Sequence, residues 1–355
     1  MTIEAGVIEG FFGRPWGEAA RLAHAQFLQA RGFRYYIYAP KADRSLRRQW
    51  REPLSGEQSA RLSALSTRFR ACGLQFGVGL TPYELHLDYS GHAKTALRSK
   101  LAQLDQTGVD ILCILFDDMH GAIPDLARLQ ARVVADISEW TSAQKIMFCP
   151  TYYSDDPILG RVFGSPPANY LADLGAALDP AISVFWTGEQ VCSSAYSDQH
   201  LEDVAGRLGR RPLIWDNHIA NDGRERCSHL YLDGLSDGWA LNNHLVEGIA
   251  FNPMNQPALS RIPLAACAAE CTGAVSDRGA RDVGSLARSI CGEELGRELA
   301  NRLELLQIQG LSGLDAAQRS GLLSTFERYA PDGCAGEICS WLRGEFEFDP
   351  QCLTD

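Results

Sequence analysis

Over about its first 260 residues, the chain alternates short apolar runs with stretches whose apolar residues recur at helical spacing. Residues 55–78 show one such unit. A capping box at 55–58 predicts the start of a helix, Gly73 predicts its end, and the apolar run 74–78 predicts a strand. The expected buried stripe of this helix is Leu62, Leu65, Phe69 and Cys72, and that of the preceding helix is Ala20, Ala23, Phe27 and Ala30. The alternation predicts βα units around a parallel sheet.

Eight such strands can be placed, separated by roughly 30–40 residues, which is the spacing of a βα repeat. Their carboxyl ends are expected near Ile8, Ala39, Gly79, Phe116, Cys149, Phe185, Trp215 and Phe251. Segment 229–235 competes with the run ending at Phe251 for the last strand. Eight strands close a barrel, whereas a doubly wound sheet more often has five or six. The sequence therefore predicts an α/β fold, a (β/α)8 TIM barrel.

The pattern changes after about residue 265, where helical stripes continue but no strand alternates with them. We therefore expect the barrel to occupy residues 1–265 and a helical C-terminal appendage to occupy residues 266–355. The stripes are Leu295, Leu299, Leu303 and Leu306, followed by Leu322, Leu323, Phe326 and Tyr329.

Charge narrows the classes of partner. The chain carries 33 Lys and Arg against 44 Asp and Glu, a formal net charge of −11. A net anionic chain binds nucleic acid and anionic membranes poorly, and no apolar run reaches the roughly 18 residues that span a bilayer. The one dense basic cluster, within 44–51, is expected to be a solvated face. We expect no nucleic-acid partner and no membrane partner.

The cysteines indicate the redox state of the cellular compartment. The chain has 11 cysteines, an odd number, and no C-x-x-C pair. Cysteines within apolar runs, together with an N-terminus (1–4) that has no basic stretch before an apolar core, favour a reducing, cytoplasmic location. The pairs Cys267/Cys271 and Cys334/Cys339 lack His or Cys partners at zinc-finger spacing. We expect no metal and no cofactor.

One carboxylate pair stands out among the polar residues at strand ends, where a barrel enzyme carries its active site. Asp117 and Asp118 directly follow the apolar run 111–116. Two adjacent carboxylates there cannot both ionise cheaply, so their pKa values should separate into one acid and one anion. Two other interpretations stay open. One aspartate caps the next helix while the other is solvated, or both join His120 as metal ligands.

The adjacency of the two aspartates also bears on mechanism. The carboxyl groups of an ordinary retaining glycosidase flank the scissile bond, about 5–5.5 Å apart. Neighbouring residues approach from one side, which suits a substrate that supplies its own nucleophile, the carbonyl oxygen of a 2-acetamido group. Aromatic, amide and carboxylate residues follow the other expected strands, and such groups suit a sugar. The sequence thus favours an N-acetylhexosaminide as substrate.

Taken in order, the strand-end motifs resemble those of glycoside hydrolase family 84, the O-GlcNAcases and bacterial β-N-acetylglucosaminidases. Each motif is weak alone, but together they cover about residues 5–255 in family order. The matching segments are 6–16 (GVIEGFFGRPW), 38–43 (YAPKAD), 50–52 (WRE), 115–118 (LFDD), 149–153 (CPTYY), 186–188 (WTG), 215–222 (WDNHIAND) and 252–253 (NP). Phe12 departs from a usual tyrosine and Tyr152 from a usual glutamate, which bears on fine specificity.

The resemblance implies a (β/α)8 catalytic domain and retaining, substrate-assisted hydrolysis through an oxazoline-like intermediate. By position, Asp117 matches the residue that polarises the acetamido group, and Asp118 matches the general acid/base. Trp215 and Asp216 lie in the same sugar-binding segment, with Trp215 as a wall of the pocket. The other matching residues are Tyr153 and Asn217 for the acetamido group, and Gly10 (through its carbonyl), Lys41, Asp222 and Asn252 for the sugar hydroxyls.

We therefore expect a retaining exo-β-N-acetylglucosaminidase that can remove O-GlcNAc from serine and threonine side chains. Its expected partners are GlcNAc-bearing glycoproteins, glycopeptides or oligosaccharides. Three alternatives stay open: an inactive GlcNAc-binding barrel, a β-N-acetylhexosaminidase acting on chito-oligosaccharides or wall fragments, and a metal-dependent hydrolase built on Asp117, Asp118 and His120. The intact aspartate pair favours an enzyme, because a binding protein needs no acid.

Overall fold

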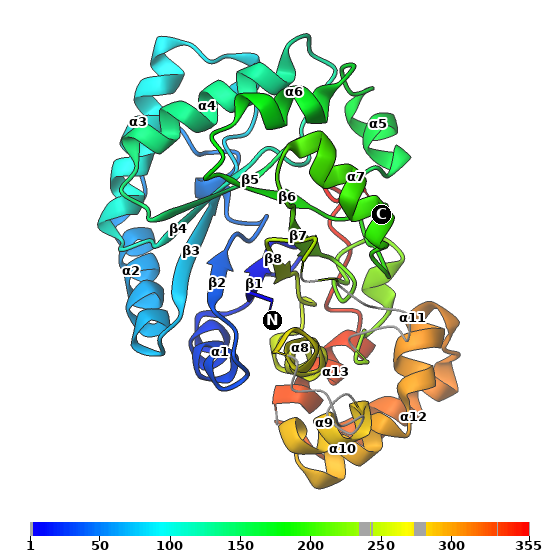
Figure 1. The fold of residues 1–355 in the computed structure, drawn as a ribbon. Coiled ribbons are helices and arrows are strands. Elements are labelled where there is room, and N and C mark those ends of the chain that lie inside the picture. The colour runs from blue at the N-terminus through cyan, green and yellow to red at the C-terminus, as the bar shows by residue number, and fades with distance from the viewer. Residues whose placement is uncertain (1–2, 234–241, 243, 273–281, 332, 355) are drawn as a thin grey trace.

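A closed barrel of eight parallel strands forms the centre of the molecule, as the sequence predicts. The computed structural model describes residues 3–233, 242, 244–272, 282–331 and 333–354. The strands pair in chain order, and β1 closes the barrel against β8 (Figure 1). They are β1 (Ala5–Glu9), β2 (Tyr35–Tyr38), β3 (Gln75–Leu80), β4 (Ile111–Leu115), β5 (Lys145–Cys149), β6 (Ser183–Trp186), β7 (Leu213–Asp216) and β8 (Gly248–Phe251).

Each strand ends within one residue of its predicted end. The competing candidate for the last strand, 229–235, is not a strand where it is described: 229–233 forms a loop, and 234–235 lie outside the described residues. All residues of β1, β2, β4, β6, β7 and β8 are buried. Because parallel strands carry their carboxyl ends to one rim, the polar residues that follow them gather there.

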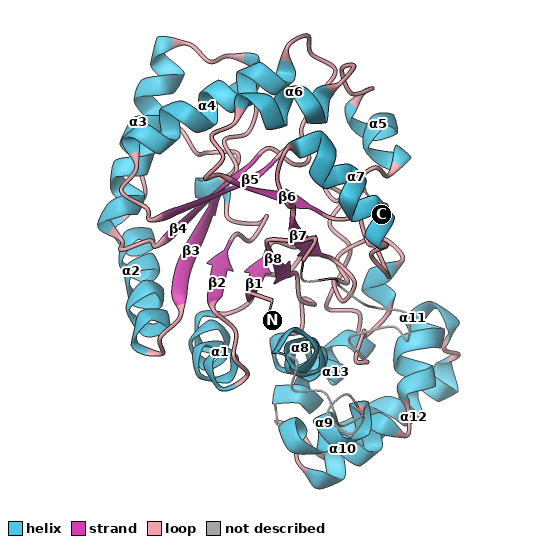
Figure 2. Cartoon of the chain, in the orientation of Figure 1, coloured by secondary structure: helices cyan, strands magenta, loops and turns pink. Residues whose placement is uncertain are grey.

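Helices surround the barrel, and those from α9 to α13 form a separate group beside α8 (Figure 2). The helices of the barrel are α1 (Glu18–Ala30), α2 (Gly56–Ala71), α3 (Gly91–Gln106), α4 (Leu126–Trp140), α5 (Pro157–Phe163), α6 (Tyr170–Ala177), α7 (Asp198–Leu208) and α8 (Pro257–Thr272), with short 3-10 turns η1 (Arg44–Leu46), η2 (Leu85–Leu87) and η3 (Arg226–Ser228). The C-terminal group holds α9 (Val283–Cys291), α10 (Glu293–Ala300), the π-helical turn η5 (Glu304–Gln309), α11 (Gly310–Gly313), α12 (Ala316–Glu327) and α13 (Gly333–Leu342).

Helix α2 begins at the predicted capping box. The Ser55 side chain accepts from the Gln58 N–H, and the Gln58 side chain accepts from the Ser55 N–H. Three residues of the predicted stripe are buried, and the fourth, Cys72, is partly exposed at the C-cap. Local capping and apolar periodicity therefore suffice to place this helix.

The predicted buried stripe of α1 is wrong. Ala23 and Ala30 are exposed, and the buried face instead carries Arg21 and His24 with Ala25 and Leu28. Arg21 is buried because its guanidinium pairs with Glu9 of β1, with nitrogen–oxygen distances of 2.7 Å. The His24 ring packs on Trp16, at 4.3 Å between ring centroids, and burial lowers the His24 pKa to about 3.

The C-terminal helices share a second apolar core, in which Leu295, Leu299 and Leu306 of the predicted stripe are buried. Helix α8 contributes to both cores: Leu264 and Cys267 pack in the barrel core, and Ile262 packs in the second. The change from barrel to appendage, which the sequence analysis places at 265/266, thus falls inside a helix.

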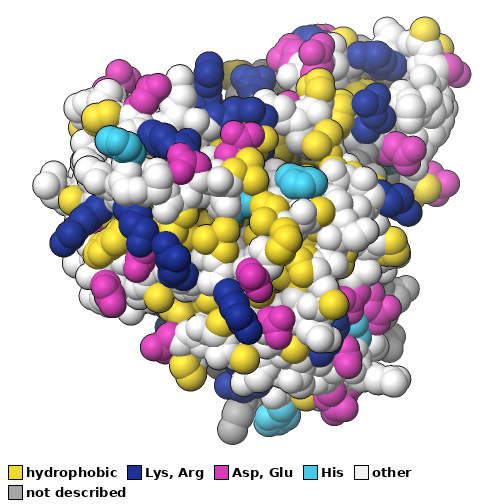
Figure 3. Space-filling view, turned by 90° about the horizontal axis from the view of Figure 1, so that it is seen from above, with side chains coloured by type: hydrophobic (Ala, Val, Ile, Leu, Met, Phe, Trp, Pro, Cys, Tyr) yellow, Lys and Arg dark blue, Asp and Glu magenta, His cyan; other side chains and the backbone are white. Residues whose placement is uncertain are grey.

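On the face seen in Figure 3, Lys and Arg side chains lie among Asp and Glu side chains, with hydrophobic side chains gathered between them. Charge of one sign does not dominate this face, in keeping with the mixed composition of the chain. Within the described part of the chain, no helix combines the length and the apolar character needed to cross a membrane.

Candidate active site

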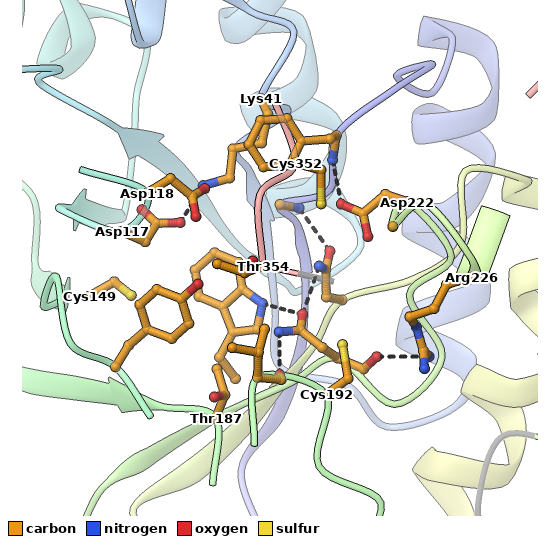
Figure 4. A pocket seen from close by; sticks show the side chains of 18 residues that line it. Lys41, Asp117, Asp118, Cys149, Thr187, Cys192, Asp222, Arg226, Cys352 and Thr354 are labelled. Carbon is orange, nitrogen blue, oxygen red and sulfur yellow. Dashed lines mark hydrogen bonds and ion pairs between the residues drawn. The ribbon is translucent and has the colours of Figure 1, made fainter. Parts of the chain in front are cut away.

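A pocket opens among the loops that follow the barrel strands, at the rim where the sequence places the chemistry (Figure 4). It brings together nine of the ten predicted site residues: Gly10, Lys41, Asp117, Asp118, Tyr153, Trp215, Asn217, Asp222 and Asn252. Further lining residues are Phe12, Cys149, Thr187, Val191, Cys192, Gly223, Arg226, Cys352 and Thr354. Residues more than 300 positions apart thus share one cavity.

Lys41 joins the two aspartates. Its ammonium contacts Asp117 Oδ2 and lies 3.1 Å from Asp118 Oδ2, and the three side chains are almost completely buried. Both carboxylates follow β4, and Lys41 follows β2, so the pair and its counter-ion come from separate strand ends. A single ammonium therefore compensates two adjacent carboxylates in a site with little solvent.

The two aspartates differ in their surroundings. Burial raises the pKa of Asp117 above its ordinary value, the charge of Lys41 opposes the shift, and the charge of Asp118 adds to it. Asp117 Oδ1 is buried without a hydrogen-bond partner. Asp118 adopts a left-handed backbone conformation, with φ of 57°, which is uncommon for a residue other than glycine. The turn thus combines a buried acceptor that lacks a protein partner with a left-handed backbone at the next residue.

A network of amides fixes the opposite side of the pocket. Asn217 Oδ1 accepts from Trp215 Nε1 and from Asn252 Nδ2, both at 2.9 Å. Asn217 Nδ2 donates to the Val191 carbonyl at 2.9 Å, and the Gly10 N–H donates to Asn252 Oδ1 at 3.1 Å. Because each amide has several partners, its donor and acceptor directions are set before a ligand arrives.

Asp222 lies on the far side of the pocket from the aspartate pair (Figure 4). Its Oδ2 accepts from the Phe12 N–H at 2.7 Å. Burial raises the Asp222 pKa above its ordinary value, and the Phe12 hydrogen bond opposes that shift. The bond to the β1 loop also fixes the position of this carboxylate.

Aromatic rings wall the cavity. The Lys41 ammonium lies 5.5 Å from the ring centroid of Phe12 and 6.0 Å from that of Trp215. Tyr153 borders the pocket, and burial together with the charges of the nearby aspartates raises its pKa well above the ordinary value. Gly10 is required here because a Cβ would meet the Trp215 ring at 2.4 Å. The pocket thus pairs apolar ring faces with fixed polar groups, a combination suited to sugars.

Asp216, the tenth predicted site residue, takes a supporting position. Its carboxylate accepts from the Tyr196 hydroxyl at 2.8 Å and from the His218 N–H at 3.0 Å. Side chains alternate along a strand, so Trp215 and Asp216 at the end of β7 point in different directions. Tyr152 also turns away and donates to the Gly164 carbonyl at 2.6 Å.

Sequence reasoning missed several lining residues. Cys149 and Thr187 stand at strand ends inside motifs that the analysis quotes, so position alone could have found them. Arg226 has a local role: it donates to the carbonyls of Ala220 and His218 at 2.8 and 2.6 Å, which ties down the loop after β7. No signal pointed to 352–354, because the sequence does not show where this segment lies.

The basic cluster is only partly the solvated face that the sequence predicts. Arg48 is exposed, but Arg47 is buried, and its guanidinium lies 5.4 Å from the Phe12 ring centroid. Both arginines also lie over the Tyr83 ring, at 5.2 and 4.7 Å. Cation–π contacts and apolar packing of the arginine stems account for the burial.

The metal-dependent alternative finds no support in the described ranges, which hold no group of three or more His, Cys, Asp or Glu side chains arranged to bind a metal ion. His120 is exposed, and its carbonyl faces His86 Nε2 at 2.8 Å. The charge that faces the aspartate pair is the Lys41 ammonium.

Known proteins resemble this chain in sequence and in fold. A family model described as beta-N-acetylglucosaminidase matches residues 5–280. Protein O-GlcNAcases of Mus musculus and Rattus norvegicus are each 34% identical over 227 residues, which is 61% of this chain and 24% of the relative. The chain thus spans about a quarter of the length of these relatives. A mutant O-GlcNAc hydrolase of Thermobaculum terrenum superposes with a TM-score of 0.74 at 29% identity, covering 96% of this chain and 75% of that one.

Proposed function

Because the chain belongs to the beta-N-acetylglucosaminidase family, we propose that it is a retaining exo-β-N-acetylglucosaminidase whose nucleophile is the 2-acetamido group of the substrate. The observation that carries the proposal is the turn at 117–118. It presents two adjacent carboxylates and one buried, unpaired carboxylate oxygen to a pocket walled by aromatic rings. A GlcNAc unit offers an amide N–H for that oxygen and a glycosidic oxygen for the neighbouring acid.

In the first step, Asp117 accepts a hydrogen bond from the acetamido N–H, which increases the negative charge on the acetamido carbonyl oxygen. That oxygen attacks the anomeric carbon, while the bond to the leaving oxygen breaks. Asp118 gives its proton to the leaving oxygen. The products of this step are an oxazolinium or oxazoline on the sugar and the free alcohol. Protonation matters most for an alkyl alcohol, because an alkoxide is a poor leaving group.

In the second step, Asp118 accepts a proton from a water molecule that attacks the anomeric carbon on the face that the alcohol left. The ring of the oxazoline opens, and the acetamido group is restored. Two inversions at one carbon retain its configuration. The net reaction consumes one water molecule and releases the free sugar and the alcohol.

The remaining lining residues have roles that follow from their fixed directions. We assign Tyr153 and Asn217 to the acetamido group. Both line the cavity, Tyr153 near the aspartate pair and Asn217 beside Trp215. We assign the sugar hydroxyls to the Gly10 carbonyl and to the charged and amide groups of Lys41, Asp222 and Asn252. Hydrogen bonds from a charged group to a hydroxyl are each worth roughly 1.5–3 kcal/mol.

We further propose that the aglycone is the serine or threonine of a glycosylated protein. The support is the likeness to two relatives named protein O-GlcNAcase and to a bacterial O-GlcNAc hydrolase. The eleven cysteines include thiols whose pKa is raised by deep burial, such as Cys113 and Cys149. Cysteines buried in this way support a reducing, cytoplasmic setting for such a substrate.

The test is turnover of an aryl β-N-acetylglucosaminide, an aryl β-glucoside and a GlcNAc-modified peptide by the same preparation. The proposal predicts release from the first and third and none from the second, which lacks the acetamido nucleophile. Turnover of a chito-oligosaccharide but not of the glycopeptide would reassign the aglycone. Binding of GlcNAc without turnover of any substrate would identify an inactive GlcNAc-binding barrel.

A further inference from the structure

The C-terminal segment 345–354 runs from the end of α13 to the pocket, where Figure 4 shows Cys352 and Thr354 among the lining side chains. Its exposure partly alternates. Phe346, Phe348, Cys352 and Thr354 are half-buried, whereas Glu345, Glu347, Gln351 and Leu353 are exposed. This pattern is typical of chain that lays one face on a surface, here interrupted by a turn at 350–351. We name it the C-terminal strap.

Arginines on the rim anchor the strap along its length. Phe346 lies 5.3 Å from the Arg14 guanidinium carbon, and Phe348 lies 4.7 Å from that of Arg224, measured to the ring centroids. Farther along, the Gln351 side-chain oxygen accepts from Arg47 at 3.2 Å and from Arg48 at 3.0 Å. Each of these four arginines belongs to a barrel loop or turn, so the strap is held to the mouth of the barrel.

The charges of strap and rim are complementary. The strap carries Glu345, Glu347 and Asp349, and it lies against the four arginines of the rim. Arg14 also pairs with Glu345 at 3.8 Å. Contacts of this kind between exposed groups are individually weak and are screened by salt. The strap is therefore held by several small contributions that can be broken together.

The end of the strap lies in the pocket of the aspartate pair. Cys352 and Thr354 line the same cavity as the aspartate pair, and the Thr354 side chain hydrogen-bonds with that of Tyr153. A turn aims Cys352 inward: its N–H donates to the Asp349 carbonyl at 2.9 Å. The volume that stays free is about 60 Å³, against the roughly 300 Å³ at which small-molecule pockets begin. The strap therefore takes up space that a monosaccharide in this pocket would need.

We propose that the C-terminal strap is a built-in competitor of the substrate, which occupies the sugar pocket and must leave before GlcNAc enters. The proposal rests on the proposed function, because the pocket has to be the sugar site. A competing segment reduces the fraction of molecules that can bind substrate, so the apparent KM rises by the inverse of that fraction. Saturating substrate displaces the strap, so kcat stays unchanged.

The first experiment compares the full chain with a chain ended after Gly344, using an aryl β-N-acetylglucosaminide. We expect the shortened enzyme to have a lower KM at equal kcat. The reduction is about tenfold if the strap occupies the pocket in about nine molecules of ten. Raising the salt concentration should lower the KM of the full chain toward that of the shortened one, because salt screens the Arg14–Glu345 pair and the attraction between the acidic strap and the rim arginines.

Full-length variants keep the test independent of any folding defect caused by shortening. Replacing two of the three anchored residues, Phe348→Ala with Gln351→Ala, should also lower KM and should leave kcat unchanged. The matched control is Leu353→Ala, because Leu353 belongs to the strap but is 52% exposed. It should behave as the unmodified chain does.

A synthetic peptide with the sequence of residues 345–354 should inhibit the shortened enzyme competitively, and a scrambled peptide should not. Equal KM values in the full chain, the shortened chain and the anchor variant would overturn the strap proposal while leaving the proposed function intact. If no form turned over the aryl substrate or bound a GlcNAc-like inhibitor, the proposed function would fail, and the strap proposal with it.

Discussion

The Lys41 ammonium contacts both carboxylates of the aspartate pair inside a buried site. Burial pushes the Asp117 pKa upward, and Lys41 is the largest influence in the other direction. For Asp117 to strengthen the acetamido nucleophile, it must be an anion. Lys41 therefore has two tasks in this account, to bind the sugar and to keep Asp117 ionised.

That dual role predicts a shift in pH dependence. The anionic fraction of Asp117 falls as pH drops through its raised pKa. The acidic limb of the kcat/KM profile should therefore lie at a higher pH than an ordinary carboxyl group would give. Lys41→Met removes the charge that lowers this pKa, so the limb should move to higher pH. Lys41→Arg keeps the charge and should leave the limb near its original position. If the acidic limb of the kcat/KM profile stayed at the same pH in Lys41→Met, Lys41 would not be the group that keeps Asp117 ionised.

The two aspartates should respond differently to the leaving group. Aryl groups of low pKa depart without a proton, whereas a serine alkoxide does not. Asp118→Asn should therefore retain appreciable ring closure with an activated aryl substrate and nearly lose the glycopeptide. Asp117→Asn should damage both, because the acetamido oxygen attacks without electrostatic help. The aryl-to-peptide rate ratio measures the difference, and an equal rise in both variants would contradict the assigned roles.

Single elements show how well the sequence predicts this fold and where it fails. The ends of all eight strands follow from apolar runs, because a buried parallel strand needs continuous apolar sequence. The buried face of α1 does not follow, since Arg21 and His24 are buried by partners on β1 and on the loop after it. Periodicity does not identify a tertiary ion pair in advance.

The Arg21–Glu9 pair makes a stability prediction for the junction of β1 and α1. Arg21→Met leaves the fully buried Glu9 carboxylate without its cation, which should lower the free energy of unfolding by about 3–5 kcal/mol. Arg34→Met, at an exposed arginine that precedes β2, serves as the control and should change it by about 0.5 kcal/mol or less. Denaturant unfolding measures both. A small effect in Arg21→Met would show that the Trp16 N–H and the Tyr36 hydroxyl suffice to hold Glu9.

At the scale of the whole molecule, the barrel rim joins residues from both ends of the chain into one pocket. Gly10 and Thr354 lie 344 positions apart in the sequence and line the same cavity. The motifs of the barrel predict nine of the residues that line this pocket, because each lies at or after the end of a strand that the fold brings to one rim. The strap was not predicted, since its place depends on cation–π and hydrogen-bond contacts with rim arginines that no local pattern encodes.

The central claim is that the acetamido oxygen of the substrate is the nucleophile. The most direct measurement is kcat/KM for a series of aryl β-glucosaminides whose N-acetyl group carries zero, one, two or three fluorine atoms. Each fluorine withdraws electrons from the carbonyl oxygen and weakens it as a nucleophile, while the sugar and the leaving group stay the same. The account predicts a steep, stepwise fall in kcat/KM along the series. A rate that hardly changes with fluorination would contradict it and would require a nucleophile supplied by the protein or by water.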